Sequence, residues 1–347
     1  MKAILYDSFE GPFRIDDVPK PEVPNDGVVI EVKASGICRS DWHGWMGHDP
    51  AITSFPHVPG HECAGTILDV GAGIQKWEPG DRVTTPFCCG CGVCPQCEAG
   101  FPNVCDNDYQ PGFTAWGTFA EYVAIRYADN NLARLPDDLD YVSAASLGCR
   151  FTTAFRGVVD QGCVRKNQWV AVYGCGGVGL SAIMIASALG ARVIGVDISE
   201  EKLTLAQSAG AEETLNASEV TNPATEIHEI TDGGAHVSID ALGSTETATN
   251  SICSLRKRGR HVQIGLTVGD ESDVIIPMDQ VIAREMEIVG SHGIQASRYK
   301  EVFSMISDGK IDPGRLVQKI VPLEDAAAEL KAMAGFDSLG MTVINRF

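Results

Sequence analysis

The chain of 347 residues lacks an excess of basic residues, the cysteine density of a disulfide scaffold, and any internal repeat or low-complexity segment. It has 27 Lys and Arg against 46 Asp and Glu, a net charge of −19, which disfavours wholesale binding to nucleic acid or anionic membranes. Twelve cysteines in 347 residues are a much smaller share than in a disulfide scaffold, where cysteine makes up roughly 8–10% of the residues. The composition, 44% hydrophobic, is that of a globular protein, and the length suggests about two domains.

No targeting segment and no long apolar helix are evident. Residues 1–11 are interrupted by Asp7 and Glu10 and contain no apolar stretch typical of a signal peptide. Residues 167–191 carry no charge, but glycines stand in their centre and the helical stretch after them is too short to span a membrane. We therefore expect a soluble protein of a reducing, cytoplasmic compartment, in which clustered cysteines hold metal rather than form disulfides.

The chain shows two different sequence patterns in succession. Residues 1 to 150 contain short β-type runs separated by Gly, Pro and Cys, which indicates an irregular β domain with long loops. From 152 to 289 strand-like and helix-like segments alternate, which predicts βαβ units and a parallel sheet, and thus an α/β plus β protein. The expected strands are 3–6, 28–33, 64–70, 81–84, 121–125, 169–173, 192–197, 236–240, 261–265 and 287–290, and the expected helices include 178–189 and 298–307.

A glycine-rich loop, Gly174-Cys175-Gly176-Gly177-Val178-Gly179, follows the strand 169–173 and opens a helix. Such glycines allow a tight turn, the approach of backbone N–H groups to a pyrophosphate, and close helix–strand packing. Asp197 ends the next strand, where a carboxylate accepts hydrogen bonds from the adenosine ribose diol. Because a 2′-phosphate would meet like charge there, the sequence predicts NAD rather than NADP. The alternatives are a glycine turn without a ligand and a solvated Asp197.

Four cysteines, Cys91, Cys94, Cys97 and Cys105, lie close together in a loop rich in Gly and Pro. Four thiolates at short spacing close the tetrahedral shell of a structural zinc site. The main rival is an iron–sulfur cluster, whose run of cysteines continues with a fourth Cys after three residues, followed by Pro. Here the last gap is seven residues and Asp106 follows, so the spacing favours structural zinc.

The candidates for a second, open metal site are Cys38, His61, Glu62 and Cys149. A catalytic zinc of the Cys2His kind has three protein ligands and keeps one position for water or substrate. The sequence positions are far apart and do not show that these residues converge, and a lone His or Cys is more often simply packed in a core.

Several motifs together favour a metal site over simple core packing. They are 60–65 (Gly-His-Glu-Cys-Ala-Gly) with Gly71 and Gly73, 80–83 (Gly-Asp-Arg-Val), the four-cysteine segment, 117–122 and the nucleotide loop. In this order they resemble the zinc-containing alcohol dehydrogenases of the medium-chain dehydrogenase/reductase family over essentially the whole chain. The resemblance implies a GroES-like catalytic domain, 1–151 and 290–347, and a Rossmann NAD-binding domain, 152–289, with the active site in the cleft between them.

By that resemblance Cys38, His61 and Cys149 hold the catalytic zinc, Asp41 orients His61, and Glu62 lies behind the metal without being a resting ligand. Ser40 would take the alcohol proton and pass it through the cofactor ribose to His43, a solvent-facing imidazole expected to titrate near neutrality. The cofactor-binding residues implied are Arg39, Thr153, Gly174, Gly176, Gly177, Val178, Gly179, Asp197, Lys202, Gly265 and Leu266. Phe87, Trp45 and Trp116 are the candidates for the substrate pocket.

The resemblance implies reversible oxidation of a primary or secondary alcohol to an aldehyde or ketone, with hydride transfer to NAD and zinc as the Lewis acid. It also implies two zinc ions per chain, a small-molecule substrate and a homotetramer. The alternatives are a polyol or threonine dehydrogenase, of which the polyol enzymes usually have Glu in place of Cys149, and a non-catalytic relative. Two departures from the family are Met341, where an arginine often meets the pyrophosphate, and Cys175, a thiol inside the phosphate loop.

Overall fold

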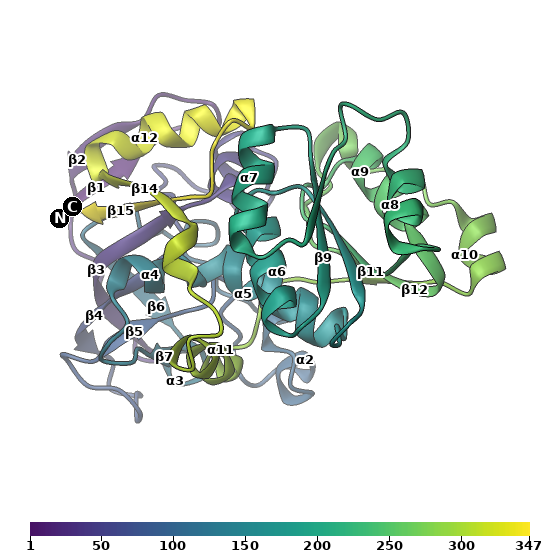
Figure 1. Ribbon diagram of the computed structural model, residues 1–347. Helices are drawn as coiled ribbons and strands as arrows, with labels where there is room; N and C mark the ends of the chain where they lie inside the picture. The colour runs from purple at the N-terminus through teal and green to yellow at the C-terminus, as the bar shows by residue number, and fades with distance from the viewer. The chain divides into compact units, whose positions relative to one another are not determined.

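The computed structural model describes residues 1–347, except for the side chain of Asp270. The chain divides into two compact units. The first unit contains Met1–Thr152, Gly293–Ser307 and Asp312–Phe347, and the second contains Thr153–His292 and Asp308–Ile311. Figure 1 labels the strands and helices of both.

The first unit is built on strands. They are β1 (Lys2–Leu5), β2 (Arg14–Asp17), β3 (Gly27–Ile37), β4 (Glu62–Val70), β5 (Arg82–Thr84), β6 (Tyr122–Arg126), β7 (Ala133–Arg134), β14 (Val317–Pro322) and β15 (Met341–Arg346). The helices are short: α1 (Arg39–Trp45), α2 (Pro95–Glu98), α3 (Ala128–Asn131), α4 (Tyr141–Ala145), α11 (Tyr299–Ser307), α12 (Leu323–Ala332), the 3₁₀ turns η1 (Pro102–Val104), η5 (Ala296–Arg298), η6 (Pro313–Leu316) and η7 (Met333–Gly335), and the π-helical turn η2 (Leu147–Phe151).

A seven-stranded sheet forms the centre of the first unit. Its order is β14-β15-β3-β4-β5-β7, and β6 pairs with β3. The C-terminal strand β15 lies antiparallel to β3, so that the tail of the chain completes the sheet begun by the N-terminal segment. β3 ends next to Cys38 and β4 begins next to His61. These two neighbouring central strands thus carry two of the expected metal ligands to the same end of the sheet.

The second unit is a parallel α/β sheet. Its strands are β8 (Trp169–Tyr173), β9 (Arg192–Asp197), β10 (Glu213–Asn216), β11 (Ala235–Asp240), β12 (Leu255–Gln263) and β13 (Glu287–Gly290). Its helices are α6 (Gly177–Ala188), α7 (Glu200–Ala209), α8 (Pro223–Thr231), α9 (Thr245–Cys253) and α10 (Met278–Arg284), with the π-helical turn η3 (Arg156–Gln161) and the 3₁₀ turn η4 (Gly269–Glu271). The short helix α5 (Thr152–Phe155) begins at the last residue of the first unit.

The strand order β10-β9-β8-β11-β12-β13, with every pair parallel, is that of a doubly wound dinucleotide-binding sheet. All five residues of β8 are buried, as expected for a central parallel strand covered on both faces. Figure 1 shows α6 and α7 on one face of this sheet and α8 and α9 on the other. The order reverses between β8 and β11, and it is at such a switch point that ligands bind.

The predicted alternation of strands and helices is confirmed, and the strands 169–173, 192–197 and 287–290 have the predicted bounds. The predicted strand 261–265 is present with other bounds, because β12 begins at Leu255 and ends at Gln263. The exposed basic run Arg256–Arg258 hides the start of this strand from a hydrophobicity pattern, and the pairing with β11 shifts its register there. No helix among the described residues combines the length and the apolar character needed to cross a membrane.

Candidate functional site

The structure brings Cys38, His61, Glu62 and Cys149 together in the first unit. One ligand atom from each lies within 4.8 Å of the others, and all four residues are buried. Cys38 follows β3 directly, His61 and Glu62 stand at the start of β4, and Cys149 lies in the π-helical turn η2. A π turn widens a helix by one residue and is frequent at functional sites. Residues that are far apart in the sequence thus form one compact cluster.

Asp41 fixes the orientation of the imidazole in this cluster. Its Oδ1 accepts from His61 Nδ1 at 2.7 Å and from the backbone N–H of Gly60 at 3.0 Å, and its Oδ2 accepts from the N–H of Cys38 at 3.0 Å. Burial alone would lower the pKa of His61, but the Asp41 carboxylate and Cys38 raise it well above its ordinary value. A carboxylate on Nδ1 leaves Nε2 as the nitrogen available to a metal.

The donor set of the cluster fits a zinc ion. His61 Nε2 is buried and has no hydrogen-bond partner among the described atoms, and two cysteine sulfurs lie beside it. A hydrogen bond from Cys149 holds the pKa of Cys38 well below its ordinary value, which favours the thiolate form of this ligand. Two thiolates and one imidazole are the ligands of an open Cys2His zinc site.

Arg150 holds the fourth member of the cluster, and its role is not evident from the sequence. Its Nε donates to Glu62 Oε1 at 3.0 Å, its Nη2 to Oε2 at 2.5 Å, and its backbone N–H to Oε1 at 3.1 Å. Both side chains are buried, and the Glu62 carboxylate keeps the pKa of Arg150 raised although burial works against it. Because both oxygens of Glu62 accept hydrogen bonds from Arg150, this carboxylate is paired with the arginine. The only sequence signal is a charged residue directly after Cys149.

Two phenylalanines line the imidazole. The ring centroid of Phe87 lies 5.9 Å from that of His61, and Phe87 belongs to one buried apolar cluster with Cys38, Cys88 and Cys149. Phe113, which sequence reasoning missed, lies 5.3 Å from His61. Aromatic walls exclude water and strengthen electrostatic interactions around the cluster. The predicted position of Phe87 is thus next to the candidate ligands.

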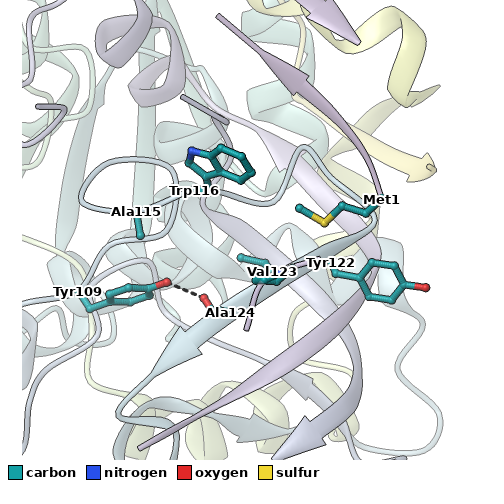
Figure 2. Close-up of a pocket in the computed structure, with 8 residues that line it drawn as sticks. Met1, Tyr109, Ala115, Trp116, Tyr122, Val123 and Ala124 are labelled. Carbon is teal, nitrogen blue, oxygen red and sulfur yellow. Dashed lines mark hydrogen bonds between the residues drawn. The ribbon is translucent and has the colours of Figure 1, made fainter. Parts of the chain in front are cut away.

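The described contacts of the two tryptophans expected in the same wall are elsewhere in the first unit. Trp45 packs against Phe13 with ring centroids 5.2 Å apart and donates to the carbonyl of Gly11. Trp116 donates to the carbonyl of Pro56. Figure 2 shows Trp116 with Tyr109 and Tyr122 around a pocket of about 230 Å³.

The four cysteines of the predicted structural zinc site also converge. The sulfurs of Cys91, Cys94, Cys97 and Cys105 lie within 4.8 Å of one another, in the segment that carries α2 and η1. Backbone N–H groups of Cys91 and Asn107 donate to the Cys105 sulfur at 3.2 and 3.3 Å. The backbone N–H groups of Cys97 and Asp106 lower the pKa of Cys94 to about 7. Four converging sulfurs and N–H donors to one of them suit a closed S4 zinc site.

The glycine loop of the second unit connects β8 to α6 as predicted. A Cβ on Gly179 would collide with the carbonyl oxygen of Gly174, so only glycine permits this close approach. α6 begins at Gly177 without a side-chain cap, which leaves its first N–H groups available for an anion. The Cys175 thiol is fully buried, and burial raises its pKa above the ordinary range. It is therefore an inert, packed thiol.

Asp197 lies at the end of β9, where the sequence placed it, and is already engaged by the loop. Its Oδ2 accepts from the N–H of Cys175 at 2.7 Å, and its Oδ1 accepts from the N–H groups of Ile198 and Ser199 at 2.8 and 3.1 Å. These contacts fix the carboxylate beside the glycine loop. Its remaining lone pairs are free to meet a diol. Lys202 lies in the first turn of α7, which Ser199 caps.

Other predicted cofactor residues lie in the second unit at the carboxyl ends of the strands. Gly265 and Leu266 follow β12, and a Cβ on Gly265 would collide with Gly243. Asp240, which was not anticipated, ends β11 and accepts from the N–H groups of Leu242 and Gly243 at 2.9 and 3.2 Å. The Thr153 hydroxyl is buried and has no hydrogen-bond partner among the described atoms.

Helix α1 of the first unit carries the predicted relay residues. Ser40 Oγ lies 3.8 Å from the Cys38 sulfur, and His43 follows three residues later on the same helix. The expectation that His43 titrates near neutrality is wrong: burial, followed by Arg39 and His48, lowers its pKa to about 4. Arg39 donates to the carbonyl of Met333 and lies between the rings of Trp42 and Phe336, at 4.6 and 3.4 Å from their centroids.

Comparisons with known proteins agree with this architecture. Residues 24–137 match the model of the alcohol dehydrogenase GroES-like domain, and residues 177–308 match that of the zinc-binding dehydrogenase. An NAD-dependent alcohol dehydrogenase of Sulfurisphaera tokodaii is 32% identical over 99% of both chains. An alcohol dehydrogenase of Geobacillus stearothermophilus is 31% identical over 94% of both. The structure of an alcohol dehydrogenase from Thermus sp. ATN1 superposes with a TM-score of 0.90 at 28% identity over 100% of both chains.

The fold and the site define an oxidoreductase with a GroES-like domain and a Rossmann-type parallel sheet, as predicted. The chain belongs to the zinc-containing alcohol dehydrogenases of the medium-chain dehydrogenase/reductase family.

Proposed function

We propose that the protein catalyses the reversible oxidation of a primary or secondary alcohol to an aldehyde or ketone, with NAD as the hydride acceptor. The convergence of Cys38, His61 and Cys149 around an unpartnered imidazole nitrogen carries this proposal. The family and the NAD-dependent relative of Sulfurisphaera tokodaii support it. A zinc ion held by these three residues supplies a Lewis acid, which lowers the pKa of a hydroxyl group and polarises a carbonyl.

The residues around the three ligands prepare this site. Asp41 holds His61 with Nε2 free, and Arg150 draws the Glu62 carboxylate away from ligation. Phe87 and Phe113 flank the imidazole and exclude water from one side of it. Ser40, beside Cys38, accepts the alcohol proton and passes it toward His43.

The cofactor assignment rests on the second unit. The open N-terminus of α6 binds the pyrophosphate and Asp197 accepts from the adenosine ribose, so NAD is preferred to NADP. Thr153, Lys202, Gly265 and Leu266 complete this site, and Arg39 adds a cation for the pyrophosphate. We assign residues 152–289 to the NAD-binding domain and residues 1–151 and 290–347 to the catalytic domain.

We further propose two zinc ions per chain, one held by Cys38, His61 and Cys149 and one by Cys91, Cys94, Cys97 and Cys105. Twelve cysteines are free of disulfides in the structure, and both sites need reduced thiols. A reducing, cytoplasmic location suits this chemistry.

We also propose a homo-oligomer, with the tetramer that the family resemblance implies as the expected state; the edge of the second unit supports association. β13 ends the parallel sheet and pairs only with β12 among the described strands. The neighbouring helix α10 buries none of its residues, and Ile275 and Ile282 are 69% and 72% exposed. An open strand edge beside exposed isoleucines is a surface that a second copy of the chain would cover.

The test is NADH formation, followed by absorbance, from NAD and a panel of short primary, secondary, benzylic and polyhydroxylated alcohols. Turnover of simple alcohols by a protein with two zinc ions per chain is expected. A Cys149→Ser variant should retain one zinc ion and lose turnover. Turnover of polyols alone would contradict the substrate class, and no turnover by a zinc-loaded protein would contradict the function.

A further inference from the structure

Two imidazoles meet at the end of α1, and only one of them belongs to the relay expected from the sequence. His43 Nδ1 lies 3.0 Å from His48 Nδ1, with ring centroids 5.3 Å apart and ring planes inclined by 44°. One nitrogen must donate while the other accepts, so the two rings share a single hydrogen between them. His43 is half-buried and His48 is exposed, so the pair leads from the interior to the surface.

The backbone and a tryptophan hold this pair together. Beyond the end of α1 the chain reverses at Gly47, which has a φ of +79°, and the N–H of His48 donates to the carbonyl of His43 at 3.0 Å. A Cβ on Gly47 would also come within 2.9 Å of the Phe9 ring. The Trp42 ring lies 5.0 Å from His43 and 5.7 Å from His48. The arrangement is therefore built by the fold and does not depend on the imidazole contact alone.

The groups around His43 disfavour a lasting positive charge on it. Burial is the largest cause of its lowered pKa, and Arg39 and His48 add to it, whereas Cys38 acts in the opposite direction. The helix α12 packs against α1, and its Lys331 lies over the ring of Trp45. A proton that reaches His43 at neutral pH is therefore held only weakly.

His48 is placed to receive that proton. It is the titratable group bonded to the Nδ1 of His43 and is itself exposed to solvent. The carboxylate that follows it in the chain, Asp49, accepts from the N–H of Ala51 at 2.9 Å. An imidazole transmits a proton by taking it on one nitrogen and releasing another from the second.

We propose that His43 and His48 form a two-imidazole proton wire, in which His48 delivers the alcohol proton to water; this inference rests on the proposed function. The proton from the relay forms a bond to His43 Nε2 as the Nδ1–H bond breaks. The hydrogen released from His43 forms a covalent bond to His48 Nδ1, and His48 releases its Nε2 hydrogen to a water molecule. Between turnovers His48 takes one proton from water at Nε2, the shared hydrogen returns from His48 Nδ1 to His43 Nδ1, and His43 releases its Nε2 hydrogen to water. These three transfers restore both tautomers with no net gain or loss of protons. No electrons are transferred, and one proton leaves per alcohol oxidised.

The experiment compares the wild-type enzyme with His48→Gln, and uses His228→Gln on α8 as the matched control. We expect His48→Gln to lower kcat for alcohol oxidation at pH 7 by about tenfold, a part of what proton transfer contributes to catalysis. The solvent deuterium isotope effect on kcat should rise, and added imidazole should restore the rate. Zinc content and NADH affinity should remain those of the wild type, because His48 contacts neither site in the structure's described contacts.

A second readout does not depend on turnover. Histidine C2 hydrogen exchange, followed by mass spectrometry, measures the pKa of each imidazole, and the pKa of His43 should rise in His48→Gln because one of the groups that lower it is removed. Wild-type values of kcat and isotope effect in His48→Gln would overturn the proton wire, as would a loss that imidazole does not restore. A wild-type enzyme that oxidises no alcohol would overturn the proposed function as well, which separates the two failures.

Discussion

Arg150 holds the carboxylate of Glu62 with its backbone N–H and two nitrogens of its guanidinium group, while the neighbouring residues Cys149 and His61 belong to the candidate zinc site. Each partner of this buried ion pair is thus bonded in the chain to a candidate ligand. The ion pair links η2 to β4 across 88 positions of sequence, next to the candidate zinc site.

Removal of one partner of this ion pair should destabilise the fold strongly. Arg150→Met leaves Glu62 buried without its counter-ion, and we expect the free energy of unfolding to fall by about 3–5 kcal/mol. The double variant Arg150→Met/Glu62→Gln should recover most of that loss, since neither charge remains. Urea denaturation measures all three proteins. The control is Arg14→Met, which breaks exposed ion pairs with Asp7 and Asp16 and should cost less than about 1 kcal/mol. Equal losses for Arg150 and Arg14 would contradict the argument.

Asp41 should matter for metal affinity more than for folding. Asp41→Asn weakens the hydrogen bond that holds His61, and we expect zinc at the open site to bind about 10–100-fold more weakly. Competition with a chromophoric chelator measures the affinity, and the zinc ion of the four-cysteine site in the same molecule serves as an internal reference. Asp69→Asn, an exposed carboxylate on β4, should leave both affinities unchanged. An unchanged affinity in Asp41→Asn would mean that the three cluster ligands alone define the site.

Asp197 should determine the choice of cofactor. Its carboxylate lies beside the glycine loop and would repel a 2′-phosphate. In Asp197→Ser we expect the ratio of kcat/KM for NAD to that for NADP to fall about 10–100-fold, the worth of one hydrogen bond to a charged group. Steady-state kinetics with both cofactors measures the ratio. Glu213→Ser, an exposed carboxylate at the start of β10, is the control. An unchanged ratio in Asp197→Ser would place cofactor selection elsewhere.

The buried imidazole of His261 should make stability depend on pH. Burial lowers the pKa of His261, so the folded chain holds fewer protons than the unfolded chain, whose histidines titrate near about 6.5. Stability therefore rises as the pH increases from 5 to 7. In His261→Gln this contribution is absent, so the difference in urea midpoint between wild type and variant should grow over the same range. Because zinc loss affects both proteins, the difference isolates His261; a constant difference would contradict the assignment.

Local features of this protein could be predicted from the sequence because their physical causes are local. The buried strand β8, the glycine loop and Asp197 follow one another in a short segment, and the four cysteines are close in sequence. The partner of Arg150 could not be predicted in this way, because Glu62 lies 88 positions earlier. The position of Arg150 beside the expected ligand Cys149 does not indicate which carboxylate it pairs with. Phe113 was missed for the same reason, since only the fold brings it to His61.

The properties that depend on burial were the hardest to predict from the sequence. His43 has the sequence position of a relay histidine, yet its pKa is set by the desolvation and the cations that surround it in the folded unit. The start of β12 was missed because Arg256–Arg258 are exposed polar residues within a strand, where a hydrophobic pattern predicts none. The family resemblance supplied the expected convergence of Cys38, His61 and Cys149, which spacing alone does not indicate.

The surface formed by β13 and α10 should hold copies of the chain together. Ile282→Glu places a charge on the exposed face of α10, next to the open edge of the sheet. Because burial of an unpaired carboxylate is costly, we expect the mass measured by light scattering after gel filtration to fall from an oligomer to a smaller species. Ile198→Glu, at an exposed isoleucine after β9, is the matched control and should leave the mass unchanged. A monomeric wild type, or an oligomer that persists in Ile282→Glu, would show that this edge is not the interface.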